Sequence, residues 1–330
     1  MNRIPSPIRH SFQEDVALSA ATSSNDAFRA DVIAGLSQPQ KSVPCKYFYD
    51  ARGGQLFDAI CNTPEYYPTR TELKLLRKHA AEIAGLAGSN AHLIEFGSGE
   101  SAKARFLIDA LKKPASYVPV DISATTLAGA AATIAPYYPK LAVRPLHADF
   151  TQDFVLPPET ASGRRVGFFP GSTIGNFTPE EAAKFLQRTA ALLGEGGLLV
   201  VGVDLKKSKR ILDDAYNDAG GVTAAFNLNL LRRINRDLRA NFDLGAFSHC
   251  AHYNLVRGRI EMHIYSLSFQ TVRVDGHMFS FIPGESIHTE NSYKYSVGEF
   301  QSLARANCFR PARIWVDEDH LFSLHCLVAA

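Results

Sequence analysis

The sequence has little cysteine, and the cysteines that it has are dispersed. Five occur among 330 residues, and no two of them form a C-x-x-C pair. An odd, scattered set of this kind predicts neither a disulfide framework nor a zinc site. We therefore expect reduced thiols, a cytoplasmic protein and no bound metal.

Long hydrophobic runs and an excess of one charge are also missing. Nowhere do about eighteen apolar residues follow one another, so the sequence predicts no transmembrane helix. Lys and Arg total 35 against 33 for Asp and Glu, which argues against a surface built to hold nucleic acid or anionic lipid. The short basic run KKSKR (206–210) is expected to be a solvated helix start. We expect a small-molecule substrate, no nucleic-acid or membrane partner, and a monomer.

What the sequence does have is an alternation of apolar strands with amphipathic helices. The expected strands are HLIEF, SYVPVD, LAVRPLHAD, RVGFFPG and GLLVVGVDL, and helices of ten to fifteen residues separate most of them. This pattern predicts βαβ units and a doubly wound, mostly parallel α/β sheet. Two C-terminal segments, ARIWVD and FSLHCLVA, are expected to add an antiparallel strand pair to that sheet.

The pattern changes after residue 206, which predicts two domains in a discontinuous arrangement. A helical run broken at Gly220-Gly221 is followed there by strands with a period of two. We expect the sheet domain to comprise 71–206 and 298–330 and to begin with a long amphipathic helix from about Thr71, which follows an aromatic segment, KYFYDARGGQLFDAICNTPEYYPTR (46–70). A smaller α+β substrate-binding domain is expected to comprise 18–70 and 207–297. Residues 1–17 are expected to be a flexible N-terminus.

A glycine turn follows the first expected strand, in LIEFGSGESAKARFL. Gly97 and Gly99 would let the backbone N–H groups of a helix start approach a cofactor. With Ala102, the turn also satisfies a relaxed dinucleotide fingerprint, so a nicotinamide-dependent oxidoreductase is a competing hypothesis. The acidic side chains favour another cofactor, because Glu95 and Glu100 would repel a pyrophosphate. S-adenosylmethionine has no phosphate, and its ammonium and sulfonium suit nearby carboxylates.

Further candidate cofactor residues stand at or near successive strand ends. Asp121 is placed to reach the ribose hydroxyls, and Asp149 and Phe150 to accept from and stack on the adenine. Lys103 in the first helical turn is a candidate for the methionine carboxylate. Simple structural roles compete with these: Asp121 as a helix N-cap and Phe150 as a core residue. Their occurrence at successive strand ends favours the functional interpretation.

Four longer strings carry a more specific signal than the glycine turn. KYFYDARGGQLFDAICNTPEYYPTRTE, FFPGSTIGNF, AYNDAGGVTAAFN and HTENSYKY together resemble the histidine Nα-methyltransferase family. The resemblance covers roughly Pro44 to the C-terminus. It implies an enzyme that trimethylates the α-amine of L-histidine to hercynine, the first step of ergothioneine biosynthesis, and converts S-adenosylmethionine to S-adenosylhomocysteine.

The resemblance also implies the residues that hold the amino acid. It places Tyr49 near the reacting amine and Tyr66 against the amine or the imidazole, and aromatic faces attract the cationic product by about 0.5–2 kcal/mol each. Gly171 and Asn176 would shape the pocket, and Asn176 and Tyr216 would bind the α-carboxylate as neutral donors. A helix cap is the competing role for Asn176, although Thr178 suits that role better.

The resemblance implies that the string HTENSYKY contacts the side chain of the substrate. Glu290 and Ser292 are two residues apart, so in a strand they point to the same face. The resemblance implies that Glu290 accepts from one imidazole N–H and that Ser292 meets the other ring nitrogen. An exposed salt bridge of Glu290 with Lys294 is the competing structural role. Met262 lines the same pocket or is a plain core residue.

The implied reaction is in-line methyl transfer to a neutral amine, which depends mostly on positioning. Tyr49 or ordered water would take the amine proton. Three alternatives remain open on the sequence: methylation of another amino acid on the same scaffold, a nicotinamide-dependent oxidoreductase, and a non-catalytic binding module or nucleic-acid methyltransferase. No Asn-Pro-Pro-Tyr type base-flipping loop is present, which disfavours action on nucleic acid.

Overall fold

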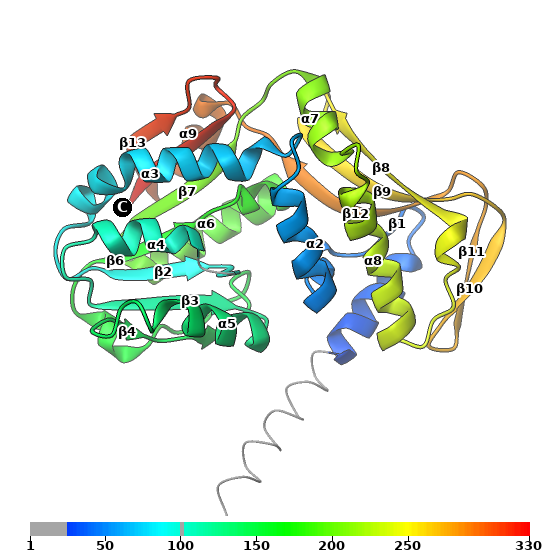
Figure 1. Ribbon diagram of the computed structural model, residues 1–330, viewed down its shortest axis with the longest axis horizontal. Coiled ribbons are helices and arrows are strands. Elements are labelled where there is room, and N and C mark those ends of the chain that lie inside the picture. Colours follow the sequence, from blue (N-terminus) through cyan, green and yellow to red (C-terminus); the bar gives the residue numbers. More distant parts are fainter. Residues whose placement is uncertain (1–24, 100–101) are drawn as a thin grey trace, which may run out of the picture. The chain divides into compact units, whose positions relative to one another are not determined.

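A computed structural model describes residues 25–99 and 102–330 (Figure 1). The expected flexible segment 1–17 and Glu100 lie outside the described residues. The chain divides into two compact units. The described part of the first unit comprises 25–60, Asn217–Ala251 and Glu261–Glu290, and the second unit comprises Cys61–Tyr216, His252–Ile260 and Asn291–Ala330. The domain boundaries expected from the sequence stay a prediction.

The second unit is built around an eight-stranded sheet with the order β13-β14-β7-β6-β2-β3-β4, and β5 also pairs with β3. The strands are β2 (His92–Phe96), β3 (Ser116–Asp121), β4 (Ala142–Val143), β5 (Leu146–His147), β6 (Arg165–Phe169), β7 (Leu198–Asp204), β13 (Phe309–Val316) and β14 (Phe322–Ala329). Strands β2 to β7 pair in parallel, whereas β14 is antiparallel to both β7 and β13. The predicted doubly wound sheet with a C-terminal antiparallel pair is therefore confirmed.

Helices cover both faces of this sheet. The helices of the second unit are α3 (Tyr67–Ala87), α4 (Ala102–Ala110), α5 (Ala124–Ile134), α6 (Pro179–Leu193), α7 (Lys209–Tyr216) and α9 (Val297–Ala306), with short 3-10 helices η2 (Pro158–Ala161) and η3 (Thr173–Asn176). Apolar residues of α3 and α4 share one buried core with the sheet, and those of α6 and α9 share the other. The two cores hold the strand ends in place.

Local capping fixes where α6 begins. Thr178 accepts a hydrogen bond from the backbone N–H of Glu181, and the Glu181 carboxylate accepts one from the N–H of Thr178. Pro179 follows as the first helical residue, where its missing N–H costs nothing. Thr178 thus caps the helix, and Asn176 is not needed for that role.

The first unit contains a second, smaller sheet. Its order is β1-β12-β9-β8, with β1 (Lys41–Ser42), β12 (Ser286–Tyr293), β9 (Arg259–Ser266) and β8 (Phe247–Asn254), and β10 (Gln270–Val274) pairs with β11 (His277–Phe281) in a separate hairpin. The ends of three of these strands belong to the second unit. Its helical segments are 25–36, η1 (Cys45–Phe48), α2 (Ala51–Cys61), α8 (Val222–Asp237) and η4 (Leu244–Ala246). The aromatic segment packs on α8, where the rings of Phe48 and Phe226 lie 4.6 Å apart.

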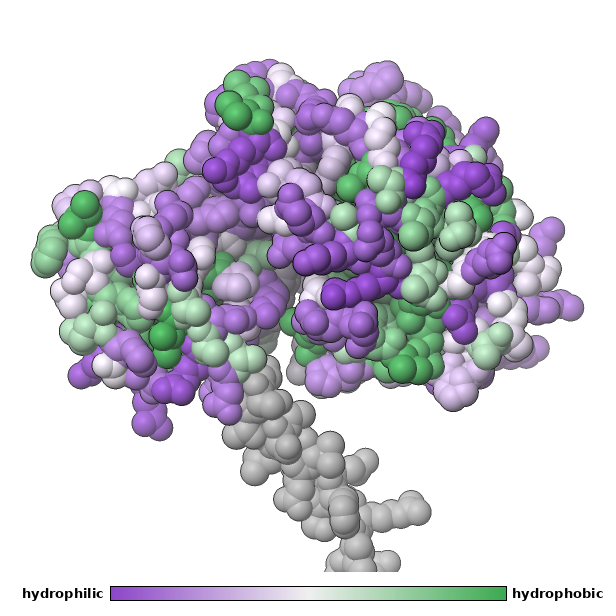
Figure 2. Space-filling model, turned by 180° about the vertical axis from the view of Figure 1, so that it is seen from behind, coloured by the Kyte–Doolittle hydropathy of each residue, from purple (hydrophilic) through white to green (hydrophobic). Residues whose placement is uncertain are grey.

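The exposed surface mixes polar and apolar residues. Figure 2 shows hydrophilic residues interspersed with smaller hydrophobic groups on the face that it draws. Apolar side chains such as Phe269 and Met278 are exposed at the β10–β11 hairpin, and scattered exposure of this kind is ordinary. None of the described helices is both long enough and apolar enough to cross a bilayer.

A buried histidine on β14 makes the stability of the folded protein depend on pH. His325 is fully buried beside the ring of Phe300, and its Nε2 lies 3.0 Å from the Ser323 hydroxyl. Its Nδ1 has no hydrogen-bond partner among the described residues. Burial lowers the pKa of His325 from 6.5 to about 3. The unfolded chain therefore binds one more proton than the folded chain between these values.

We expect the free energy of unfolding to fall as the pH drops below about 6.5, by up to about 1.4 kcal/mol per pH unit from this residue alone. Urea unfolding of the protein and of His325→Gln between pH 7.5 and about 4.5 tests this expectation. The variant should show the shallower slope of stability against pH. Equal slopes would contradict the role of His325, whatever the absolute stabilities are.

Candidate active site

Four predicted site residues, and one aspartate that was not predicted, follow the parallel strands of the second unit at one edge. Gly97 follows β2, Asp121 ends β3, Asp149 lies two residues beyond β5, Gly171 lies two residues beyond β6, and Asp204 ends β7. Strand β2 lies between β3 and β6, so the order of connection reverses at this strand. Ligands of open α/β sheets bind beyond the carboxyl ends of the strands at such a point. This edge is the candidate cofactor site.

The glycine turn after β2 keeps space free beside an aromatic ring. Gly97 and Gly99 both have positive φ, at 72° and 47°, a conformation that favours glycine. A Cβ on Gly97 would lie 3.5 Å from the ring of Phe150. Phe150 is half-buried and also packs on Phe169, with ring centroids 5.7 Å apart. It therefore has a core role, and its edge faces the turn.

Two carboxylates at the ends of β3 and β5 are held by local backbone groups. Asp121 accepts a hydrogen bond from the N–H of Ser123 at 2.8 Å, and burial raises its pKa. Ser123 is the N-cap of α5, so Asp121 does not have that role. Asp149 accepts from the N–H of Thr151 at 2.8 Å and from the hydroxyl of the same residue at 2.6 Å. Both carboxylates are therefore fixed by neighbouring residues.

Glu95 lies inside the sheet and not at its edge. It is 1% exposed on β2, and the Tyr117 hydroxyl donates to its carboxylate. The hydrogen bond between Tyr117 and Glu95 within the second unit is thus structural. A contact of Glu95 with the cofactor stays a prediction.

A buried glutamate that the sequence did not single out links two predicted residues. Glu72 on α3 accepts from Lys103 Nζ at 2.6 Å and from the N–H of Gly171 at 2.8 Å. A Cβ on Gly202 would lie only 2.1 Å from the Glu72 carboxylate, so a larger residue there would displace this carboxylate. Glu72 fixes both Lys103 and Gly171 at the sheet edge. Glu72 could have been found from the sequence, because it is a charged residue on the apolar face of an amphipathic helix.

A second group of predicted residues gathers around Ser292 on β12. The Tyr216 hydroxyl donates to the Ser292 hydroxyl at 2.9 Å, and the rings of Tyr66 and Tyr216 meet edge to face at 6.2 Å. Asn176 ends η3, which is pressed against the end of β12, because a Cβ on Gly175 would lie 2.6 Å from the carbonyl oxygen of Tyr293. The structure thus brings Tyr66, Tyr216 and Ser292 together.

Two buried lysines meet one buried aspartate beside this group. Asp204 accepts from Lys294 Nζ at 2.7 Å, from Lys207 Nζ at 2.6 Å and from the Tyr67 hydroxyl at 2.7 Å. Burial would raise the pKa of Asp204, but the two ammonium groups outweigh it and lower the pKa. Burial lowers the pKa of Lys207 to about 8. Burial alone would lower the pKa of Lys294, but the Asp204 carboxylate outweighs burial and raises this pKa above its usual value.

These contacts exclude one competing role and correct one expectation from the sequence. Lys294 is 2% exposed and pairs with Asp204, so the exposed Glu290–Lys294 salt bridge is wrong. Lys207 of the basic run is buried too, whereas Lys206 pairs with Glu299 at the surface. The expected solvated helix start is therefore wrong for Lys207, because Asp204 draws its ammonium inward.

Tyr49 and Met262 belong to the first unit. Tyr49 is 44% exposed, and its ring lies 5.7 Å from that of Phe57 and 5.8 Å from that of Phe226. Met262 is buried on β9, and its carbonyl oxygen accepts from the Thr289 hydroxyl at 3.1 Å. Their roles toward a substrate stay predictions.

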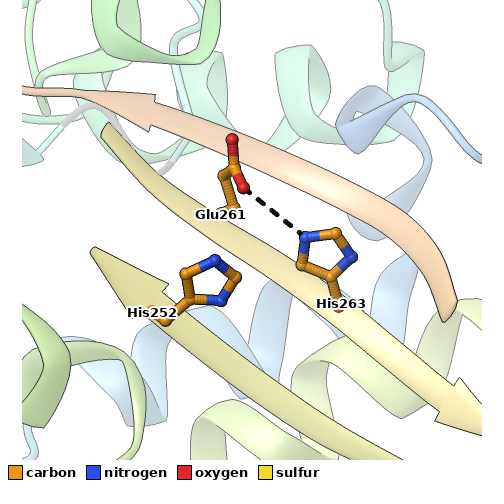
Figure 3. Close-up of side chains that lie close together, drawn as sticks. All are labelled: His252, Glu261 and His263. Atoms are coloured by element: carbon orange, nitrogen blue, oxygen red, sulfur yellow. Dashed lines mark ion pairs between the residues drawn. The ribbon is translucent and has the colours of Figure 1, made fainter. Parts of the chain in front are cut away.

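Glu290 lies on a face of the small sheet that is rich in imidazoles and carboxylates. The carbonyl oxygen of Glu290 lies 3.1 Å from Nε2 of His288, whose ring is 4.9 Å from that of His263. Figure 3 shows His263 paired with Glu261 on β9, at 3.9 Å. The expectation of no metal stays a prediction.

Comparison with known proteins decides the family. The sequence profile of a family described as histidine-specific, S-adenosylmethionine-dependent methyltransferases matches residues 28–329. The chain belongs to this family. It is an S-adenosylmethionine-dependent N-methyltransferase, and the family resemblance predicted from the four strings is confirmed.

The two sequence relatives named first below agree with the family assignment. A histidine N-alpha-methyltransferase of Mycolicibacterium smegmatis is 42% identical over 314 residues, which cover 94% of this chain and 97% of that protein. Ergothioneine biosynthesis protein 1 of Neurospora crassa is 35% identical over 200 residues, covering 59% of this chain and 23% of that protein. A solved S-adenosylmethionine-dependent methyltransferase from Clostridium acetobutylicum is 10% identical, with a TM-score of 0.44 and coverage of 77% and 92%.

Proposed function

We propose that this methyltransferase transfers three methyl groups in turn from S-adenosylmethionine to the α-amine of L-histidine, producing hercynine for ergothioneine biosynthesis. The observation that carries the proposal is the extent of the family match, 28–329. It includes both the glycine turn of the large sheet and the strand that bears Glu290 and Ser292. We further expect a cytoplasmic monomer that needs no metal and no nucleic acid.

The strand edge of the second unit fits the donor molecule. Gly97 and Gly99 leave room beside Phe150, which supports stacking on the adenine. The fixed carboxylates of Asp121 and Asp149 suit ribose hydroxyls and an adenine amino group. Lys103 already has Glu72 as a partner, so a methionine carboxylate would share this ammonium.

The donor supplies an electrophilic methyl group, and the residues of this chain position the acceptor amine. We assign the α-carboxylate to Asn176 and Tyr216, and the imidazole to Glu290 and Ser292. Gly171, Tyr66 and Met262 would complete the pocket walls. Tyr49 or ordered water would accept the amine proton. Aromatic faces at Tyr49 and Tyr66 would tolerate the permanent cation of the product, which a cationic side chain would repel.

Mass spectrometry of L-histidine incubated with the protein and S-adenosylmethionine tests the proposal. We expect successive products with one, two and three added methyl groups, all on the α-nitrogen. Tryptophan and phenylalanine in parallel reactions serve as controls and should be poor substrates. Methylation of a ring nitrogen, or faster turnover of tryptophan, would reject the assignment of the substrate.

A further inference from the structure

One buried carboxylate contacts two separate parts of the candidate site. Glu72 on α3 is fully buried. Its Oε2 accepts from Lys103 Nζ at 2.6 Å, and its two oxygens lie 2.8 and 3.0 Å from the backbone N–H of Gly171. All three residues belong to the second unit. The Glu72 carboxylate therefore has one charged donor and one neutral donor.

The charged donor lies on the cofactor side of the site. Lys103 is in the first turn of α4, shortly after the glycine turn, and its side chain is 22% exposed. An ammonium group has three N–H donors, and Glu72 takes one of them. The exposed part of Lys103, which we call the donor anchor, can thus meet a second carboxylate, assigned above to the methionine part of S-adenosylmethionine. Glu72 does not compete with that carboxylate but fixes the ammonium that would bind it.

The neutral donor begins the loop on the acceptor side. This acceptor loop, residues 170–176, contains two successive left-handed residues, Gly171 with φ of 77° and Ser172 with φ of 57°. The Ser172 hydroxyl accepts from the backbone N–H of Asp204 at 2.9 Å. Asn176, which we assign to the α-carboxylate of L-histidine, ends the loop. The loop is therefore fixed by Glu72 at its first glycine and by the end of β7 at the next residue.

The donor anchor and the acceptor loop pass close to each other at this carboxylate. A Cβ on Gly171 would lie 3.4 Å from Lys103 Nζ. On the opposite side, a Cβ on Gly202 would lie 2.1 Å from Oε1 of Glu72, the oxygen that is 2.8 Å from the Gly171 N–H. Strand β7 thus leaves the space that this oxygen occupies. The position of one carboxylate determines how the anchor and the loop are spaced.

We propose that Glu72 is a positioning residue that holds the acceptor loop at a fixed distance from the donor anchor, so that the methyl group and the amine meet in line. This inference rests on the proposed function. Methyl transfer depends mostly on positioning, and a displacement of about 1 Å can cost about 100-fold in rate. Glu72 needs no contact with either substrate, because it acts through Lys103 and Gly171.

A glutamine at position 72 separates the two contacts. An amide keeps one acceptor oxygen and replaces the other with an NH₂ group, which is a donor. The charged Lys103 attracts the amide oxygen more strongly than the neutral N–H of Gly171 does. The NH₂ group then faces the Gly171 N–H, and two donors oppose each other. Glu72→Gln should therefore displace the acceptor loop and leave the donor anchor near its place.

Steady-state kinetics with both substrates varied tests this inference. In Glu72→Gln, kcat/KM for L-histidine should fall about tenfold, within the range for a buried donor that loses its acceptor. The KM for S-adenosylmethionine, and the Kd for S-adenosylhomocysteine measured by calorimetry, should change less than about threefold. Glu82→Gln, at a half-exposed glutamate of the same helix, is the matched control and should leave all these values within about twofold.

Three results in Glu72→Gln would overturn the inference. Equal losses for the two substrates would show that the glutamate is purely structural. A loss confined to S-adenosylmethionine would show that it positions Lys103 alone. An unchanged kcat/KM for histidine would show that the acceptor loop is held without it.

A second variant moves Glu72 without replacing it, in case Glu72→Gln does not fold. The Cβ in Gly202→Ala needs the space of Oε1, so the carboxylate has to move away from the Gly171 N–H. We expect the same selective loss for histidine, and unchanged histidine kinetics would contradict the inference. Methylation of another amino acid in place of histidine would reject the proposed function alone, because the same comparison with that acceptor would still test Glu72.

Discussion

Replacing Glu290 by alanine is expected to lower kcat/KM for L-histidine by about 10- to 100-fold, the loss that corresponds to one hydrogen bond to a charged group of about 1.5–3 kcal/mol. The physical reason is that the ring N–H of the proposed substrate loses its hydrogen-bond acceptor. The loss should appear mainly in KM, because the proposed function assigns the methyl donor and the amine to other residues. Steady-state kinetics with both substrates varied gives the two parameters.

A conservative variant separates recognition from folding. Glu290→Gln keeps an amide oxygen in the same place, so it should lose less than Glu290→Ala, and both should keep the circular dichroism spectrum and thermal midpoint of the parent. Discrimination between histidine and phenylalanine should narrow in Glu290→Ala. Full retention of affinity and turnover in Glu290→Ala would remove this residue from the imidazole site.

The parallel core of the sheet could be predicted because its signal is local. Strands β2, β3, β6 and β7 are short apolar runs, buried on both faces, and each ends at a turn or a polar residue. The predicted strand LAVRPLHAD is instead divided into β4 and β5, each of two residues. Pro145 lies between them and has no N–H for the ladder, which explains the division.

The start of α3 also differs from its prediction. The sequence predicted a helix from about Thr71, and the structure begins it at Tyr67 with Pro68 in the first turn. Proline is favoured there because its missing N–H would have had no partner. The prediction that the helix starts after the aromatic segment did not take this preference of proline into account.

The candidate site could be predicted only where residues follow strand ends or match a family string. Asp121, Asp149 and Gly171 follow strands, and the sheet topology brings those ends to one edge. Asp204 also ends a strand, and the same rule would have found it. Its partner Lys294 is 90 residues away along the chain by numbering, and no local pattern indicates that pairing. The alternation 290, 292, 294 placed Lys294 on the face of Ser292, but it could not say that the lysine is buried.

Removal of the Asp204 carboxylate should have the largest effect on stability. In Asp204→Ala, Lys207 and Lys294 would remain buried beside each other without their shared anion, and Tyr67 would lose its acceptor. Breaking a buried ion pair from one side typically costs about 3–5 kcal/mol. Urea unfolding should show that loss in the free energy of unfolding, whereas Asp214→Ala, which breaks the surface pair with Arg210, should cost at most about 1 kcal/mol.

A double variant measures how far the stability contributions of Asp204 and Lys294 depend on each other. Asp204→Ala combined with Lys294→Met removes both members of the pair and puts apolar groups in their place, and such replacements are often close to neutral. The double variant should therefore be more stable than Asp204→Ala alone, and the difference is the coupling energy of the pair. A double variant no more stable than Asp204→Ala would mean that the lysine is not destabilised by the loss of its partner.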